Sequence, residues 1–328
     1  MKKSFLKWTV ITFAAVSCID GAVAYGLAHP DFLLRAPSGY RAFIRGIYLD
    51  GARNVIQFEP DCARYNSELT YTLKPGEFFF SNPEYNTKYR VNSLGMRSAE
   101  EDLRAPDVIV IGDSRAMGWG VGQEDMYTEL LRQWTGFKTL NAAVSSYGTV
   151  REMKLLDRLD TTRLKYLVLH YVDNDYEENA SFRQHDNFLN IMEREKYEKI
   201  QRQYLSSKRY YFGKYTFFFL YRVGAEVYTT YLRLRGIDEL KSDVPYFLNA
   251  LIHGRKTPLD GPRLVVMANG KFLERLKREI AANEYPAYVE NMILVSDDVS
   301  ESGYFVLDNH MNQKGHRFLA ERLRPVLK

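Results

Sequence analysis

The chain has 328 residues and an ordinary apolar content, so it can bury a full core, and one large domain with additions is expected. Its net charge of +4 is small and its basic residues form no long run, which argues against a nucleic-acid-binding protein. The two cysteines are Cys18, within an apolar N-terminal segment, and Cys62, so neither a disulfide framework nor a cysteine-based metal site is expected.

Residues 1–28 are predicted to be a signal peptide or a membrane anchor. Three lysines precede an apolar run over residues 8–19, whose length fits a secretory signal better than a full span of about 20 residues. The sequence Ala-Val-Ala at 22–24 is then the cleavage site. The alternatives are an uncleaved anchor over residues 8–28, which tolerates Asp20, and a buried helix of the fold. The first two place the rest of the chain outside the cytoplasm.

Residues 29–104 are predicted to form a mostly β extension. Turn signals rich in proline and glycine recur at 37–39, 74–76 and 82–83, and the stretch 69–73 has β-type composition. We expect this extension to pack on the domain that follows it.

From residue 106 onward, short apolar strands alternate with helices. Such alternation is typical of a parallel sheet covered by helices on both faces, a three-layer α/β sandwich. In these sheets a ligand binds at the carboxyl ends of the strands. Strands are predicted at 108–111, 137–143, 166–171, 263–268 and 292–295, and helices at 124–133, 150–159, 271–282 and 314–327.

A long insertion over residues 176–262 separates the third and fourth strands. Its segment 191–206 has helical periodicity, and its segment 209–234 interleaves tyrosine and phenylalanine with lysine and arginine. We interpret the aromatic segment as a cap helix packed against the sheet domain, as an acceptor groove for sugar rings, or as a helix at a membrane interface. A lid over the active site is compatible with these interpretations.

The first strand of the sheet ends in a Gly-Asp-Ser turn, which places the hydroxyl of Ser114 where the next helix begins. Asp308 and His310 supply the carboxylate and the imidazole that a serine nucleophile needs. Because they are two residues apart, they are expected on a loop rather than a helix. The structural alternative is that Ser114 only caps the helix and has no catalytic role. Asp113 is expected to be a structural hydrogen-bond acceptor.

Four short motifs occur in the order of the blocks of the SGNH (GDSL-type) hydrolase family, which this sequence resembles over residues 105–175 and 263–328. The resemblance implies a flavodoxin-like fold and a serine hydrolase that acts on ester bonds and needs neither cofactor nor metal. The motifs are Gly112-Asp113-Ser114, Asn141-Ala142-Ala143-Val144-Ser145-Ser146, Asp173-Asn174-Asp175 and Asp308-Asn309-His310.

By this resemblance Ser114 is the nucleophile, His310 is the general base and later the acid, and Asp308 orients the imidazole. The oxyanion hole combines the backbone N–H groups of Ser114 and Ser146 with the side-chain amide of Asn174. One such donor typically contributes about 3–4 kcal/mol of transition-state stabilisation.

Two positions depart from the family pattern, since Ser146 and Asp173 stand where glycine is usual. Serine retains the backbone N–H, but a positive φ angle would be costly for it. Asp173 would bring a negative charge near the pocket and disfavour anionic substrates.

Together these inferences predict an exported, envelope-directed esterase that removes an O-acyl group, with acetyl favoured, from a glycan through an acyl-enzyme. An O-acetyltransferase that shares the first half-reaction is the alternative, and a non-catalytic envelope protein that binds glycan or a partner is the second. Membrane association through residues 8–28 and 209–234 is compatible with each. The acyl group, the glycan and the oligomeric state are not predicted.

Overall fold

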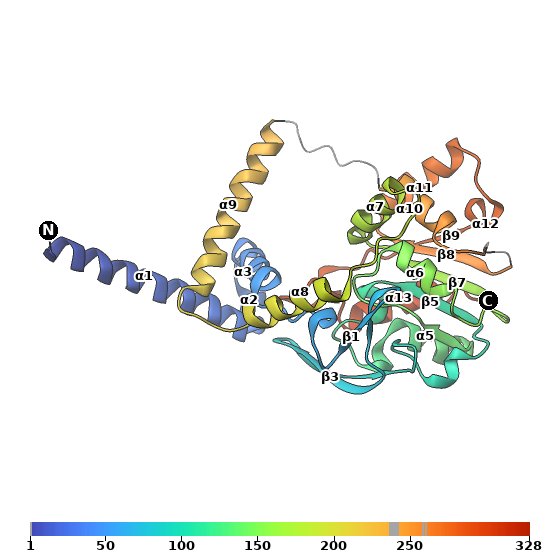
Figure 1. Cartoon of the computed structure of the whole chain (residues 1–328), viewed down its shortest axis with the longest axis horizontal. Coiled ribbons are helices and arrows are strands. Elements are labelled where there is room, and N and C mark those ends of the chain that lie inside the picture. The colour runs from blue at the N-terminus through green and yellow to red at the C-terminus, as the bar shows by residue number, and fades with distance from the viewer. Residues whose placement is uncertain (1, 236–242, 258, 260) are drawn as a thin grey trace.

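The computed structural model describes residues 2–235, 243–257, 259 and 261–328, and it is organised around a five-stranded sheet (Figure 1). The strands lie in the order β6-β5-β7-β8-β9, and every neighbouring pair is parallel. The predicted α/β fold with a central parallel sheet is therefore confirmed. The bounds are β5 (Val108–Gly112), β6 (Thr139–Asn141), β7 (Tyr166–His170), β8 (Arg263–Ala268) and β9 (Ile293–Ser296).

Alternate residues of the central strands enter two separate cores. Ile109 and Ile111 of β5 lie in one core, and Val108 and Val110 lie in the other. Both sets are buried because helices cover both faces of the sheet. This double burial explains why the strand is a continuous apolar run in the sequence instead of an alternating one.

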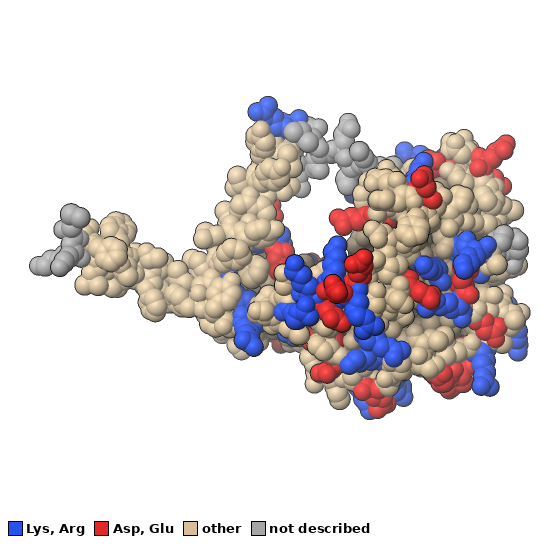
Figure 2. Space-filling model, viewed as in Figure 1, with Lys and Arg blue, Asp and Glu red and all other residues tan. Residues whose placement is uncertain are grey.

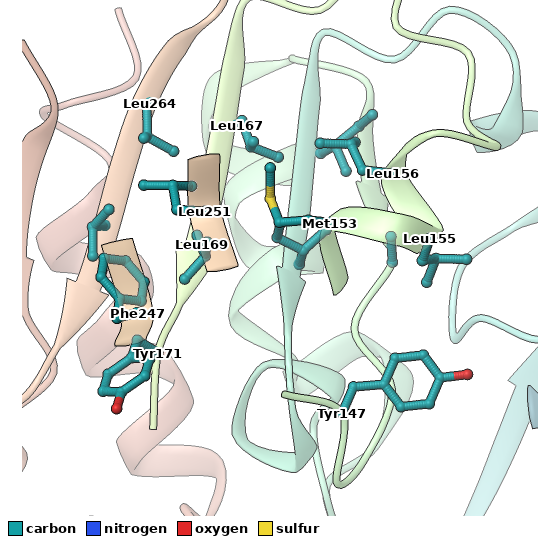
Figure 3. Packing of buried hydrophobic residues seen from close by; sticks show 14 of the residues in the cluster. Tyr147, Met153, Leu155, Leu156, Leu167, Leu169, Tyr171, Phe247, Leu251 and Leu264 are labelled. Atoms are coloured by element: carbon teal, nitrogen blue, oxygen red, sulfur yellow. The ribbon is translucent and has the colours of Figure 1, made fainter. Parts of the chain in front are cut away.

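Helices that follow β5 in the chain form the two outer layers. Figure 3 shows Met153 of α6 (Thr149–Leu156) and Phe247 and Leu251 of α10 (Val244–His253) packed beside Leu167 and Leu169 of β7. Each helix predicted for this domain is present, with ends that differ by a few residues. One face is covered by α6 (Thr149–Leu156), α10 (Val244–His253), α11 (Gly270–Ala282) and α12 (Ala287–Glu290), and the other by α5 (Tyr127–Thr135) and α13 (Gln313–Leu323).

Several short helices connect these layers. The one that matters for the site is α4 (Ser114–Met117), which follows β5 directly. The 3-10 helices are η1 (Ile56–Phe58), η2 (Glu100–Leu103), η3 (Gln123–Asp125), η4 (Asp173–Asp175) and η5 (Glu301–Gly303).

The N-terminal extension is β-rich only in its second half, so the prediction of a mostly β segment was wrong for residues 30–51. Pro37 was weighed as a turn signal, but it stands at a helix start, as Pro30 does, where the missing N–H of proline is tolerated. The extension consists of α2 (Pro30–Arg35), α3 (Ser38–Gly51) and two antiparallel hairpins, β1 (Ala63–Asn66) with β2 (Thr70–Leu73) and β3 (Gly76–Asn82) with β4 (Tyr85–Val91).

The insertion is helical, as predicted, but its aromatic helix does not cover the sheet. It comprises α7 (Tyr176–Gln184), α8 (Arg194–Ser207), α9 (Lys214–Leu234) and α10. Helix α9 packs against α1 (Lys2–Ala28) and α3 and stands away from the sheet domain (Figure 1). The interpretation as a cap helix packed on the sheet domain is therefore wrong for this segment.

The N-terminal segment is one continuous helix through Asp20. Among the described residues, one helical stretch, Ser4–Ala28, is long and apolar enough to cross a membrane by length and composition. Its C-terminal part is buried, since Val23 and Leu27 lie in a small core with Ile47 of α3. The interpretation as a buried helix therefore applies to the last turns alone.

Candidate active site

The turn between β5 and α4 presents Ser114 at the carboxyl end of the sheet. Gly112 has a φ of 155°, and a Cβ there would lie 2.7 Å from the Cβ of Ala116, so this close turn requires glycine. Asp113 caps the helix, because its Oδ1 accepts the backbone N–H of Arg115 at 2.9 Å. Ser114 is the first residue of the helix, and its own N–H consequently has no partner within the helix.

The three residues predicted as the catalytic triad lie in one hydrogen-bonded chain. His310 Nε2 is 2.7 Å from Ser114 Oγ, and His310 Nδ1 is 2.5 Å from Asp308 Oδ1. All three residues are buried. With the Nδ1 proton donated to the carboxylate, Nε2 is left as the acceptor for the serine hydroxyl. The geometry is that of a serine whose proton can pass to an imidazole.

Three donors that the sequence analysis missed hold the second carboxylate oxygen of Asp308. Tyr48 donates its hydroxyl to Oδ2 at 2.9 Å, Trp119 donates Nε1 at 3.0 Å, and the Tyr85 hydroxyl lies 3.4 Å away. Tyr48 comes from α3 and Tyr85 from β4, so the N-terminal extension supplies two of the three. The carboxylate is thereby fixed in the orientation that His310 needs.

The charge of Asp308 is also secured by its surroundings. Burial by itself raises the pKa of Asp308, but the charge and hydrogen bond of His310, the Arg53 guanidinium and the Tyr48 hydroxyl together hold this pKa well below its usual range. A carboxyl group with a depressed pKa keeps its interactions above its ordinary pKa and loses them only in strong acid. Asp308 is therefore ionised under all ordinary conditions.

Glu84, in the turn between β3 and β4, holds the loop that carries the triad carboxylate. Its carboxylate accepts the backbone N–H groups of Val306, Leu307 and Asp308 at 2.5, 2.8 and 2.9 Å. Burial raises the pKa of Glu84, and the three N–H groups oppose that rise. A single glutamate in a turn has no distinguishing pattern, which is why sequence reasoning did not find it.

Trp119 lies on the imidazole of the triad. Its ring stacks on that of His310 with centroids 4.5 Å apart and an interplanar angle of 14°. The loop that carries it is held from inside by the fully buried Arg97, which donates to the carbonyl groups of Met117, Gly118 and Val121.

We expect Arg97→Met to lower the free energy of unfolding by about 3–5 kcal/mol, because three buried carbonyl groups would lose a charged donor. Chemical denaturation measures this loss. Arg90→Met is the matched control, since Arg90 is exposed on β4, and its stability should be near that of the wild type. A loss as small as that of the control would show that Arg97 does not hold the loop.

The three predicted oxyanion donors follow three neighbouring strands. Ser146 has a φ of 58°, the left-handed conformation that was expected to be costly for serine, at about 1–2 kcal/mol. Its Oγ accepts the side-chain amide of Gln57 at 3.2 Å, a contact that glycine could not make. Asn174 Nδ2 donates to Asp113 Oδ2 at 3.1 Å, and Ser114 Oγ lies at the same distance from this oxygen, so the amide lies beside Ser114.

Asp173 lies at the edge of this arrangement. It is exposed, and its Oδ1 accepts the side-chain amide of Asn269 at 3.1 Å. Its predicted effect on anionic substrates stays a prediction.

A second histidine–aspartate pair is connected to the turn that carries Ser114. His170, buried at the end of β7, has Nε2 3.1 Å from Asp297 Oδ2, and Arg115 forms an ion pair with the same oxygen at 3.0 Å. Burial raises the pKa of Asp297, but His170 and Arg115 outweigh it and lower this pKa. The pair anchors the residue next to Ser114. Asp297 was missed, although its place directly after β9 was a usable signal.

His316, the third buried histidine, supports α5 by accepting the backbone N–H of Tyr127 on Nδ1 at 3.3 Å. Burial lowers the pKa of His316 to about 3. Unfolded histidine binds a proton near pH 6.5, so stability is complete above that pH and falls as the pH drops toward about 3.

We expect His316→Asn, which keeps an acceptor but does not titrate, to reduce the acid sensitivity of the fold. Between about pH 7.5 and about pH 5, its loss of unfolding free energy should be smaller than that of the wild type by about 2 kcal/mol. Denaturant titrations at both values measure this difference. His253→Asn, at an exposed histidine, should leave the acid sensitivity unchanged. If His316→Asn and His253→Asn lost the same unfolding free energy between these two pH values, burial of a neutral His316 would not be the cause of the acid sensitivity.

A polar groove of about 850 Å³ adjoins the site between the β3–β4 hairpin, the loop after α4 and the segment before Asp308. Tyr85 and Phe305 line it, with ring centroids 5.1 Å apart, beside Thr87 and Gln123. The triad residues are not part of its lining, and Tyr85 connects the two regions. Within the described ranges, no group of three or more histidine, cysteine, aspartate or glutamate residues is placed to hold a metal.

No family model matches this chain, and no curated protein matches it. Several solved structures match this chain. A protein described as lipolytic and of the G-D-S-L family, from Desulfitobacterium hafniense, is 13% identical with a TM-score of 0.35, over 67% of this chain and 98% of that one. A carbohydrate acetylesterase family member from Sinorhizobium meliloti is 11% identical with a TM-score of 0.33, over 67% and 97%. A carbohydrate esterase with catalytic and non-catalytic binding functions is 14% identical with a TM-score of 0.35, over 68% of each chain.

These neighbours are GDSL-type proteins and carbohydrate esterases. The G-D-S-L name printed for the first of them is that of the family that the four sequence motifs resemble. The roles of individual residues rest on the geometry of this chain.

Proposed function

We propose that this protein is a serine esterase. The observation that carries the proposal is the hydrogen-bonded chain from Ser114 through His310 to the buried carboxylate of Asp308. Ser114 Oγ attacks the ester carbonyl while His310 Nε2 takes its proton, and His310 then protonates the departing alcohol. Water attacks the resulting acyl-serine with His310 again as base, which releases the acid and restores the serine.

We assign the stabilisation of the oxyanion to the N–H groups of Ser114 and Ser146 and to the amide of Asn174. The amide of Asn174 carries two hydrogens, so its bond to Asp113 leaves one for the oxyanion. The left-handed conformation of Ser146 supports this assignment, because strained backbone persists where the surrounding structure requires it.

We further propose that the substrate is an O-acyl ester, acetyl in the first instance, on a glycan outside the cytoplasm. The polar groove with aromatic side chains next to the site supports a polar polymer as the alcohol part. The export of the chain is supported by the apolar helix Ser4–Ala28 together with the lysines at positions 2, 3 and 7 of the chain, since positive charge favours the cytoplasmic side.

A fluorophosphonate probe tests the nucleophile in the full chain in detergent micelles. We expect labelling of the wild type and its loss in Ser114→Ala and His310→Ala. Folded wild type that does not react would contradict the esterase and favour a binding protein.

An O-acetylated glycan then tests the substrate, with acetate release and transfer to a second glycan measured in parallel. Release of acetate is expected. Transfer without net release would make the protein an O-acetyltransferase.

A further inference from the structure

One side of α9 is apolar along its length and is exposed to solvent. Its residues recur every three or four positions, which places them on one side of a helix. A continuous apolar surface of this kind marks an interaction site rather than a surface for water. The face consists of Phe217, Leu220, Tyr221, Val223, Val227, Tyr228 and Tyr231, whose exposed fractions lie between 43% and 65%.

The opposite side of α9 changes character where α3 ends. Phe219 packs its ring against α3, and Arg222 forms an ion pair with α3 at 3.1 Å. Further along the same side, the exposed residues Glu226 and Thr229 are polar. Where the helix projects beyond α3, it is therefore polar toward the body of the protein and apolar on the outside. This is the reverse of a helix that packs onto its own domain.

Asp20 ties α9 to the apolar N-terminal helix. Its Oδ1 accepts the backbone N–H and the hydroxyl of Thr216, both at 2.7 Å, and its Oδ2 accepts the N–H of Gly213 at 2.9 Å and the hydroxyl of Tyr210 at 3.0 Å. The one acidic residue within α1 is thus the cap of α9 and is itself buried. Cleavage after Ala24 would remove this cap.

The two helices form an arm with little charge. Helix α9 runs across the direction of α1 (Figure 1), and Figure 2 shows the arm almost without charged residues while the body carries many. A bilayer entered by α1 would therefore meet α9 lying along its surface. Tyrosines such as Tyr221, Tyr228 and Tyr231 suit that depth, where the ring is buried and the hydroxyl stays hydrated. The apolar residues of α1 that are exposed include Phe5, Leu6, Trp8, Val10, Ile11 and Phe13.

We propose that α1 and α9 form one membrane-binding unit. Helix α1 is retained in the mature protein and inserts into a phospholipid bilayer, and the exposed face of α9 lies in the headgroup region of the same bilayer. The proposal does not depend on the esterase activity, because it uses none of the residues of the active site.

Two adjacent residues of α9, one on the apolar face and one outside it, provide the test. The full chain in a Cys18→Ser background, which leaves only the buried Cys62, carries a nitroxide at Tyr228→Cys or at Thr229→Cys. Each is reconstituted into vesicles of phosphatidylcholine and phosphatidylglycerol. We expect the label at 228 to collide more often with oxygen than with a water-soluble nickel chelate, and the label at 229 to show the reverse. Equal access of the chelate to both labels would overturn the proposal and leave a protein partner for this face.

A matched pair of substitutions sharpens the result. Val227 and Thr229 have side chains of the same shape, so Val227→Asp and Thr229→Asp add the same charge to opposite sides of the helix. Both variants carry the nitroxide at position 228. Val227→Asp is expected to raise the access of the nickel chelate to this label, and Thr229→Asp is expected to leave that access unchanged. Equal effects would contradict the proposal.

The mass of the purified protein tests whether α1 is retained. We expect residues 1–28 to be present in the membrane-bound protein. A purified chain that begins near Tyr25 would overturn the proposal that α1 is retained in the mature protein. Fluorophosphonate labelling of Ser114 in the same samples keeps this outcome separate from the proposed esterase activity.

Discussion

Replacement of Ser114 by alanine is expected to lower kcat for ester hydrolysis by a factor of about 10⁴–10⁶, and His310→Ala by a similar factor. The hydroxyl of Ser114 is a weak nucleophile unless His310 Nε2, 2.7 Å away, removes its proton. Because the two residues act as one unit, the double variant should lose no more than either single variant does.

The measurement is the rate of p-nitrophenyl acetate hydrolysis by the full chain, with circular dichroism to verify the fold. Ser145→Ala is the control, since Ser145 is a buried serine near the site that lies outside the triad. Its activity should stay near that of the wild type. Hydrolysis by Ser114→Ala at a tenth of the wild-type rate or more would exclude the serine mechanism.

Asp308→Asn is expected to lower kcat by about 10⁴-fold, the loss that the corresponding change produces in serine proteases. An amide in place of the carboxylate can donate to His310 Nδ1, which moves the proton to Nε2 and removes the acceptor for Ser114. The overall structure should persist, because the Tyr48 hydroxyl still has an acceptor in the amide oxygen.

Tyr48→Phe distinguishes the charge of Asp308 from its orientation. It removes one donor to Oδ2 and leaves the carboxylate, so we expect a loss of about tenfold in kcat with little change in KM. Recording kcat against pH for both variants checks the assignment. If Asp308→Asn retained more activity than Tyr48→Phe, the carboxylate would not be the group that orients His310.

The parallel sheet and the position of Ser114 were predictable because their signals are local. An apolar run such as residues 108–111 predicts a buried strand, and a turn of Gly-Asp-Ser directly after it predicts an exposed hydroxyl at a helix start. The strand, the helix and the motif order all agree with the structure. Strand ends of a parallel sheet meet at one edge, so motifs far apart in sequence could be expected to lie close together.

The support of the triad could not be predicted. Tyr48 lies 260 residues before Asp308, and Glu84 lies 224 residues before it. Neither has a neighbour in sequence that marks its role. The helices α2 and α3 were missed because proline and glycine have the same appearance in a turn and at a helix terminus, and only the burial of Ile44 and Ile47 against α1 selects the helix.

Local patterns thus specified the α/β sheet, the serine turn and the Asp308–His310 pair, since strand periodicity, helix caps and short motifs depend on residues close in sequence. The packing of distant segments specified the rest: which hydroxyls hold Asp308, that Ser146 adopts a left-handed φ, and that Asp20 caps α9. Contacts of this kind form only when the whole chain is folded, because burial and long-range hydrogen bonds have no periodicity in the sequence.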